Sequence, residues 1–406
     1  MAIQGFLDWF VVGLRWVHIV AILGWVGTSL YFMWLESKLR LPSPARENVL
    51  GEAWMGHGGG FYILEKRRIS PGQVPSPVYW FRMEAGITWI TGFLLLVFVY
   101  YWTGGVDLVN PEISALSPKS AIGFAIALLV LGWVVYDRIW VSDLAERKAT
   151  FATVLSLILL FAVVYLLCKL LTGRAAFIHA GAILGTNMVA SVWTRIIPAQ
   201  EEAVAATAAG RERNVVFGLR ARRRALHNTY LTLPVIFTMI AVHAPGAHSH
   251  SLNWLVLSLL IVVGIAARHL MMMFDRRQPA GPAWLSAGAP LAAALVALGL
   301  LSIPPNPANN VEPSEGRVPF TVVRGIVDLR CVSCHSRNPT DKAFLTAPSG
   351  LSFGTAEEIA VRAALIKSSI VVTRAMPPRN TTRMTDEERT LISRWVDQGA
   401  HIAASP

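Results

Sequence analysis

The chain has 406 residues, of which 54% are hydrophobic and only 15% are charged, and it carries a net charge of +11. A composition this apolar excludes an ordinary soluble protein and predicts a membrane protein of two or three domains. The positive charge does not indicate nucleic-acid binding, because its distribution along the chain follows a membrane topology.

Eight apolar runs recur over the first three quarters of the chain, each close to the roughly 20 residues that a helix needs to cross a bilayer. The first run lacks a basic leader and contains Asp8, Arg15 and His18, so we expect an uncleaved transmembrane helix. The predicted spans are residues 8–35, 79–103, 119–140, 150–172, 175–197, 226–244, 251–274 and 282–303.

Lys and Arg are concentrated in alternate loops. If the N-terminus lies outside, the inside loops carry 18 Lys and Arg, whereas the outside segments carry three, namely Lys119, Lys169 and Arg174. This asymmetry is the bias that orients membrane proteins, and with eight spans it predicts an outer C-terminus. The inside loops under this topology are residues 36–78, 137–149, 195–225 and 274–284.

The first inside loop contains His57-Gly58-Gly59-Gly60. Consecutive glycines favour either a tight turn or a close approach of the backbone to a ligand, and both readings stay open. Further along, segment 199–222 is rich in Ala, Glu and Arg, which predicts a helix on the cytoplasmic side.

Ionisable and polar residues inside membrane spans are costly and usually functional. One group lies in the inner half or at the inner boundary: Arg82, Glu84, Asn187, Arg195, His227, Asn228, Tyr230 and His269. Arg offers paired donors to a planar anion, His and Glu can exchange protons, and Asn and Tyr can orient a ring. The alternative is that these residues snorkel at the boundary or cap helices.

A second group, His18, His179 and His243, lies in the outer half of the spans. Histidines at matching depth on different helices are candidate ligands for an intramembrane haem. The alternative is that each imidazole is satisfied by hydrogen bonds within the helix bundle.

Residues 304–316 are Pro-rich and polar, which is typical of a linker. The tail 317–406 that follows contains Cys331-Val332-Ser333-Cys334-His335. Two cysteines at this spacing reach both vinyl groups of one haem as thioethers, and the adjacent His is placed to ligate the iron. The third cysteine, Cys168, lies in an apolar run, so the zinc alternative lacks a second ligand pair.

The tail also contains two methionines that could supply the second axial ligand. Met376 precedes two prolines that would stiffen the loop presenting its sulfur, so we favour it over Met384. Thr385 and Glu388 form a capping-box pattern that begins a closing helix. The tail therefore predicts a small all-α cytochrome c domain.

These features together resemble the membrane-bound urate oxidase (urate hydroxylase) family, bacterial proteins with an eight-span domain fused to a c-type cytochrome. The resemblance covers essentially the whole chain. It is carried by the tail motifs and by strings at residues 15–18, 25–29, 57–62 and 227–234, which read RWVH, WVGTS, HGGGFY and HNTYLTLP.

The fold expected is all-α: a polytopic membrane bundle of about eight helices at 1–303, a linker at 304–316 and a periplasmic cytochrome c domain at 317–406. The resemblance implies a multi-pass protein of the bacterial inner membrane that oxidises urate to 5-hydroxyisourate. Water supplies the added oxygen. Electrons leave through the covalent haem c, held by Cys331, Cys334, His335 and Met376, to a soluble cytochrome c or a terminal oxidase of the respiratory chain.

The site list beyond the haem rests on the residues and not on the resemblance. An inner urate site would use Glu84 and His227 as acid and base, with Arg82 or Arg195 as the anion partner. Because the bilayer core is about 30 Å thick, electrons from an inner site need a relay. The relay would be either a haem b on His18 and His179 or a chain of Trp and Tyr side chains, whereas an outer site would need none.

Two other classes of function remain open. The chain could be an electron-transfer cytochrome subunit without an organic substrate, or a transporter or redox sensor with a cytochrome tail. A pure electron-transfer subunit does not need a shared cavity faced by Arg82, Glu84, Asn187, Arg195 and Asn228.

Overall fold

The computed structural model describes residues 2–110, 114–241, 243–275, 280–302, 316–341, 347–372, 374 and 376–402. Within this part of the chain the structure is helical except for one antiparallel hairpin. The expected all-α class is therefore confirmed. The predicted linker falls largely outside the described residues.

The membrane part consists of long helices joined by short connections. Its elements are α1 (Ala2–Lys38), β1 (Val49–His57), β2 (Gly60–Arg67), α2 (Arg82–Leu96), α3 (Pro118–Val141), α4 (Asp143–Arg147), α5 (Ala149–Leu170), α6 (Gly173–Ser191), α7 (Ile197–Ala208), α8 (Val215–Ala241), α9 (Pro245–His248), α10 (Asn253–Asp275), α11 (Ala280–Ala283) and α12 (Ala289–Leu301). Short π-helical turns at Val97–Tyr101, Val192–Ile196 and Trp284–Gly288 extend α2, link α6 to α7 and precede α12.

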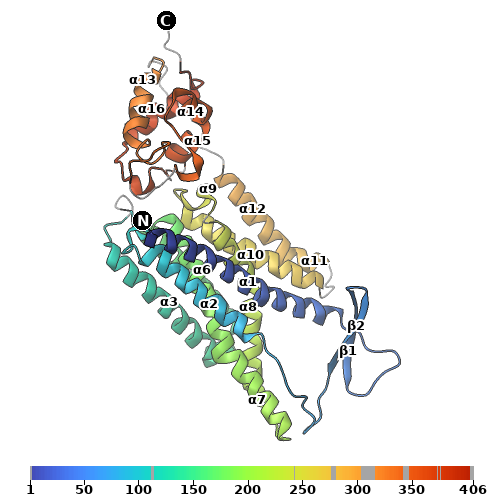
Figure 1. The fold of residues 1–406 in the computed structure, drawn as a ribbon. Helices are drawn as coiled ribbons and strands as arrows, with labels where there is room; N and C mark the ends of the chain where they lie inside the picture. Colours follow the sequence, from blue (N-terminus) through green and yellow to red (C-terminus); the bar gives the residue numbers. More distant parts are fainter. Residues whose placement is uncertain are drawn as a thin grey trace.

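Seven helical segments of the described chain are long and apolar enough to cross a membrane. They correspond to seven of the eight predicted spans. The remaining span, 226–244, lies in α8, which packs against α6 and α10. Its first turns carry Arg220 and Arg222 to Arg224, which lower the hydropathy of the helix although it runs through the same bundle (Figure 1).

The glycine string of the first inside loop forms the turn of the β1–β2 hairpin. His57 pairs with Gly60, and Gly58 and Gly59 between them both have positive φ (60° and 80°). Such a two-residue turn favours glycine at both positions, because a side chain there would be strained. The tight-turn interpretation is confirmed.

Helix α6 is the centre of the bundle. In the most apolar stretch of the segment that begins with α6, 72% of the residues are buried, more than in any other span described. It contacts α2, α3, α5 and α8. Small residues such as Ala175, Ala176 and Ala180 let these neighbours approach closely, as is usual in membrane bundles.

The tail forms a separate small helical core. Its helices are α13 (Phe320–Arg330), α14 (Ala356–Val361), α15 (Ala363–Lys367) and α16 (Asp386–Asp397). Helix α13 packs against α16, and Val323, Ile392 and Trp395 are buried between the elements of the tail. The predicted capping box is present, since the side chains of Thr385 and Glu388 each accept a hydrogen bond from the other residue's backbone N–H.

The two ends of the bundle differ. The N-terminus and the tail lie at one end, whereas the hairpin and α7 lie at the other (Figure 1). This arrangement agrees with the predicted alternation of loops, in which 36–78 and 195–225 share a side opposite to the N-terminus.

Candidate cofactor and substrate sites

The Cys-x-x-Cys-His motif forms a compact turn directly after α13. The backbone N–H groups of Cys334 and His335 donate to the carbonyl of Cys331 at 3.2 and 2.8 Å. Cys331 packs against the hydrophobic core of the tail. The turn brings both thiols and the imidazole into one short segment, as attachment of a single haem requires.

The orientation of His335 suits an axial ligand. Its Nδ1 lies 3.0 Å from the carbonyl oxygen of Leu351, so Nδ1–H donates and Nε2 carries the lone pair. A backbone partner of this kind fixes the tautomer and the ring plane of a metal-binding histidine. The ring of Phe353 lies against the imidazole with centroids 5.1 Å apart. These residues fit a c-type haem.

The acidity of the two thiols bears on the alternative that Cys331 and Cys334 form a redox-active dithiol. Burial raises the pKa of Cys331 to about 12, and burial raises the pKa of Cys334 as well. A reactive dithiol needs a lowered thiol pKa, since the thiolate is the nucleophile. The environment of this pair therefore does not suit thiol–disulfide exchange.

Met376 and Met384 lie in different surroundings. Met384 is only 2% exposed and belongs to the buried core. Met376 is half-buried at the edge of that core, where its N–H donates to Ser369 and its carbonyl accepts from Arg389, both at 3.0 Å. Its backbone is held while its side chain lies at the edge of the core, so Met376 remains the predicted ligand.

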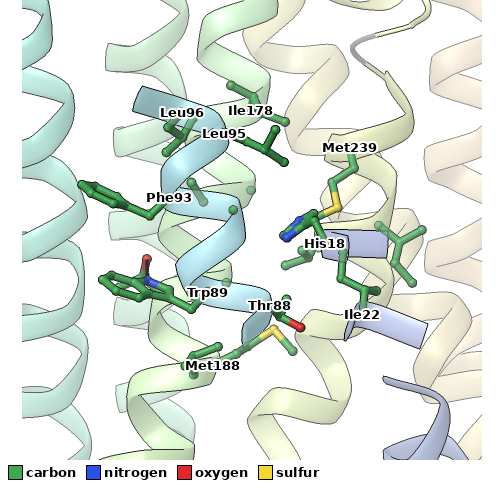
Figure 2. Close-up of a pocket in the computed structure, with 18 of the residues that line it drawn as sticks. His18, Ile22, Thr88, Trp89, Phe93, Leu95, Leu96, Ile178, Met188 and Met239 are labelled. Carbon is green, nitrogen blue, oxygen red and sulfur yellow. Dashed lines mark hydrogen bonds between the residues drawn. The ribbon is translucent and has the colours of Figure 1, made fainter. Parts of the chain in front are cut away.

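A cavity of about 350 Å³ lies in the membrane domain between α1, α2, α6 and α8. Its walls are mostly aliphatic and aromatic, and Figure 2 shows Ile22, Phe93 and Leu95 among them. Arg15 and Arg174 line its outer end, near the end of the bundle that bears the N-terminus. It is far larger than the cavity of about 30 Å³ that Arg195 and Arg224 line.

His18 on α1 presents a ring nitrogen to this cavity. The hydroxyl of Thr91 donates to the carbonyl of Ile87 at 2.7 Å, so its oxygen accepts the Nδ1–H of His18 at 2.9 Å. Nε2 therefore carries the lone pair. Gly92 makes room for the ring, because a Cβ there would lie 2.9 Å from Cε1 of His18.

The other two outer histidines differ from His18. His179 donates from Nδ1 to the carbonyl of Ala175 at 2.7 Å, and its Nε2 lies 2.9 Å from the hydroxyl of Tyr101. Both of its ring nitrogens are engaged, and it is not among the residues lining the cavity. His243, at the end of α8, does line the cavity.

The inner candidates do not form one cluster, because consecutive residues of a helix point about 100° apart. On α8, His227 contacts Tyr136 of α3 at 2.9 Å, Asn228 donates to the carbonyl of Met188 at 3.0 Å, and Tyr230 contacts His269 of α10 at 2.6 Å. Arg82 lies at the inner surface and pairs with Glu201 at 2.9 Å.

Arg195 belongs to a buried charge network that the sequence analysis missed. The carboxylate of Asp137 accepts from Nε of Arg195 at 3.0 Å and from Arg224 at 2.7 Å. Arg224 is only 2% exposed, and its guanidinium lies 4.5 Å from the centroid of Tyr136. Asp137 falls where the predicted span 119–140 overlaps the predicted loop 137–149, and an acid at the end of an apolar run opposite an Arg cluster is the signal that could have revealed the network.

Several buried polar atoms of the inner half have no hydrogen-bond partner among the described residues. They are Oε2 of Glu84, Oδ1 of Asn187, Oγ of Ser191, Oδ1 of Asn228, one terminal nitrogen of Arg224 and Nε of Arg268. Buried polar groups are normally satisfied, so an accumulation of orphans in one half of the bundle indicates a place for water or a polar ligand.

Arg268 on α10 was also missed by the sequence analysis. It is 2% exposed, and its recorded side-chain contact is to the sulfur of Met33 at 2.9 Å. Within the described chain it forms no salt bridge. Asp275 of the same helix acts on Arg268 electrostatically without reaching salt-bridge distance, and a buried guanidinium without a paired carboxylate is costly, which makes Arg268 a candidate partner for an anion.

The family model described as "Urate oxidase N-terminal" matches residues 4–300, which is nearly all of the membrane domain. No curated protein and no solved structure matches the chain.

Proposed function

Because the chain belongs to the urate oxidase N-terminal family, we propose that it oxidises urate to 5-hydroxyisourate and passes the electrons through its own cytochrome c domain. The observation that carries the proposal is the combination, in one chain, of this family's membrane domain with a Cys-x-x-Cys-His turn whose His335 is oriented as an axial ligand.

The reaction balances without molecular oxygen at the substrate. Urate and water give 5-hydroxyisourate, two protons and two electrons, and the new C5–O bond takes its oxygen from water. A c-type haem accepts one electron at a time, so the two electrons leave in succession. The final acceptor is a respiratory component, either a soluble cytochrome c or a terminal oxidase.

We propose that urate binds in the inner half of the bundle, against the orphaned polar atoms. Glu84 and Asn228 lie one helical turn inward of Thr88 and Thr232, which line the inner end of the cavity. Their unpartnered oxygens, with that of Asn187, can accept from the N–H groups of the purine.

The electrostatics of this region suit a urate monoanion. Arg195 already shares the carboxylate of Asp137 with Arg224, and Arg82 is exposed and paired with Glu201. Arg268 is buried and forms no salt bridge in the described chain, so it is the better partner for the anion. Glu84 remains the candidate acid and base, with Asn187 and Asn228 orienting the ring, whereas His227 and Tyr230 turn toward α3 and α10 and lie outside this group.

Placement in the bacterial inner membrane with a periplasmic tail is part of the same proposal. It is supported by the membrane-spanning helices, by the distribution of Lys and Arg, and by the position of the tail at the end opposite to the hairpin. Covalent haem attachment requires that outer side.

The test is anaerobic addition of urate to the purified full-length protein while haem c reduction and urate loss are recorded together. We expect two electrons to appear as reduced haem per urate consumed, with xanthine giving no reduction. The double variant Cys331→Ser/Cys334→Ser should bind no covalent haem and lose turnover with an artificial cytochrome acceptor.

Two outcomes contradict the proposal. If urate is consumed only with oxygen and with stoichiometric hydrogen peroxide, the cytochrome is not the electron outlet. If urate is not consumed while reduced quinol or a protein donor reduces haem c, the chain is an electron-transfer subunit instead.

A further inference from the structure

We propose that the outer cavity of the membrane domain binds a second, non-covalent haem with His18 as an axial ligand. This inference deepens the proposed function by supplying a route for electrons from an inner urate site. Its test counts haem in the resting protein, so it can fail or succeed independently of urate turnover.

The imidazole of His18 is prepared for a metal. Thr91 uses its proton on the carbonyl of Ile87 and can only accept from His18, so Nδ1 of His18 holds the hydrogen and Nε2 is the free donor atom. A hydrogen bond from Nδ1–H to a fixed oxygen is the usual support of a metal-binding histidine. The bond to Thr91 uses Nδ1 and not Nε2.

The cavity has the polarity of an amphipathic macrocycle. Its walls are apolar, and the two cations Arg15 and Arg174 lie at its outer end, where neither forms a salt bridge in the described chain. From Arg15 to Trp25, α1 rises about 15 Å, which sets the depth of the lined space. Haem carries two carboxylates on one edge and an apolar rim on the other. The carboxylates would face the two arginines at the outer end, and the apolar rim would face the apolar walls further in.

Urate matches the same cavity poorly. Every edge of the purine carries a polar atom, and each unsatisfied polar group costs about 1–3 kcal/mol when buried. The indole N–H of Trp89 already donates to Thr186 at 3.1 Å, so it is not free to contribute. The cost of burying unsatisfied polar groups therefore favours haem in the outer cavity. It favours urate beside the unpartnered polar atoms of the inner half.

Helix α8 supplies further soft or imidazole donors to the same space. Met239 lies at the level of His18 (Figure 2), and His243, beyond the end of α8, also lines the cavity. The arrangement replaces the pair expected from the sequence, since both ring nitrogens of His179 are used by Ala175 and Tyr101.

The test is a pyridine haemochrome measurement on the purified full-length protein before and after extraction with acidified acetone. We expect one covalent haem and one extractable haem per chain. His18→Ala should lose the extractable haem and keep the covalent one, and His18→Gly with added imidazole should recover it. The matched control His179→Gln can retain hydrogen bonds to Ala175 and Tyr101 and should keep both haems.

Thr91→Val covers the case in which His18→Ala fails to fold. Loss of the acceptor for Nδ1–H makes the imidazole a weaker donor, so the midpoint potential of the extractable haem should rise while that of haem c stays unchanged. Arg15→Gln/Arg174→Gln should lower haem occupancy. A single covalent haem per chain in the active wild-type protein, or an extracted quinone with no extractable haem, would overturn the proposal.

Discussion

Removal of the Asp137 carboxylate should destabilise the membrane domain far more than removal of an exposed acid at the same end. Asp137 is the shared counter-ion of Arg195 and Arg224, whose side chains are 35% and 2% exposed. Breaking a buried ion pair by removing one partner costs about 3–5 kcal/mol, because the other charge stays buried without compensation. We therefore expect Asp137→Ala to approach this range.

The expected loss of unfolding free energy can be converted into a shift of the melting temperature. For a domain of this size, 1 kcal/mol lowers Tm by roughly 2 °C, so Asp137→Ala should lower Tm by about 6–10 °C. The measurement is the temperature at which the detergent-solubilised protein loses its monodisperse peak in size-exclusion chromatography. The variant Asp137→Asn/Arg224→Gln removes both opposed charges and should recover more than half of the loss.

The matched control is Glu146→Ala. Glu146 pairs with Arg220 at 2.5 Å, but the two side chains are 39% and 35% exposed. An exposed pair contributes at most about 1 kcal/mol, so Tm should fall by no more than roughly 2 °C. Equal shifts for Asp137→Ala and Glu146→Ala would refute the assignment of Asp137 as the counter-ion of a buried guanidinium.

Three further predictions concern the cytochrome, the topology and the urate site. Met376→Ala should lose the weak near-infrared methionine-to-iron band and fall in haem potential while keeping covalent haem. Met384→Ala should keep the band and lose about 2–5 kcal/mol of tail stability. A band that survives in Met376→Ala would show that another residue is the ligand. A reporter fused after Arg224 should read cytoplasmic and one at the C-terminus periplasmic, and the reverse pair of results would invert the depth assigned to every intramembrane residue. Arg268→Gln and Glu84→Gln should each lower kcat/KM for urate at least about tenfold, or about 1.4 kcal/mol, with Arg220→Gln as the exposed control; normal kinetics in both would exclude the inner site.

Some properties of this protein follow from the sequence by itself. The apolar runs determine where helices cross the membrane, because hydrocarbon excludes unpaired backbone groups whatever the neighbouring helices are. The spacing of Cys331, Cys334 and His335 is local, since all three residues lie within one turn, so the proposed haem attachment site could be predicted without the tertiary structure. The capping box at Thr385 and the turn at Gly58 and Gly59 are local in the same way.

The intramembrane sites depended on tertiary structure. Sequence spacing ranks residues by depth, but it does not tell which neighbour each helix face meets, so His227, Asn228 and Tyr230 seemed one group and in fact face three different helices. Likewise His18 and His179 are equivalent by depth, and only their hydrogen bonds distinguish a free ring nitrogen from a satisfied one. Arg268 became a candidate anion partner only because it forms no salt bridge in the described chain. That depends on how the helices pack and not on the order of residues along the chain.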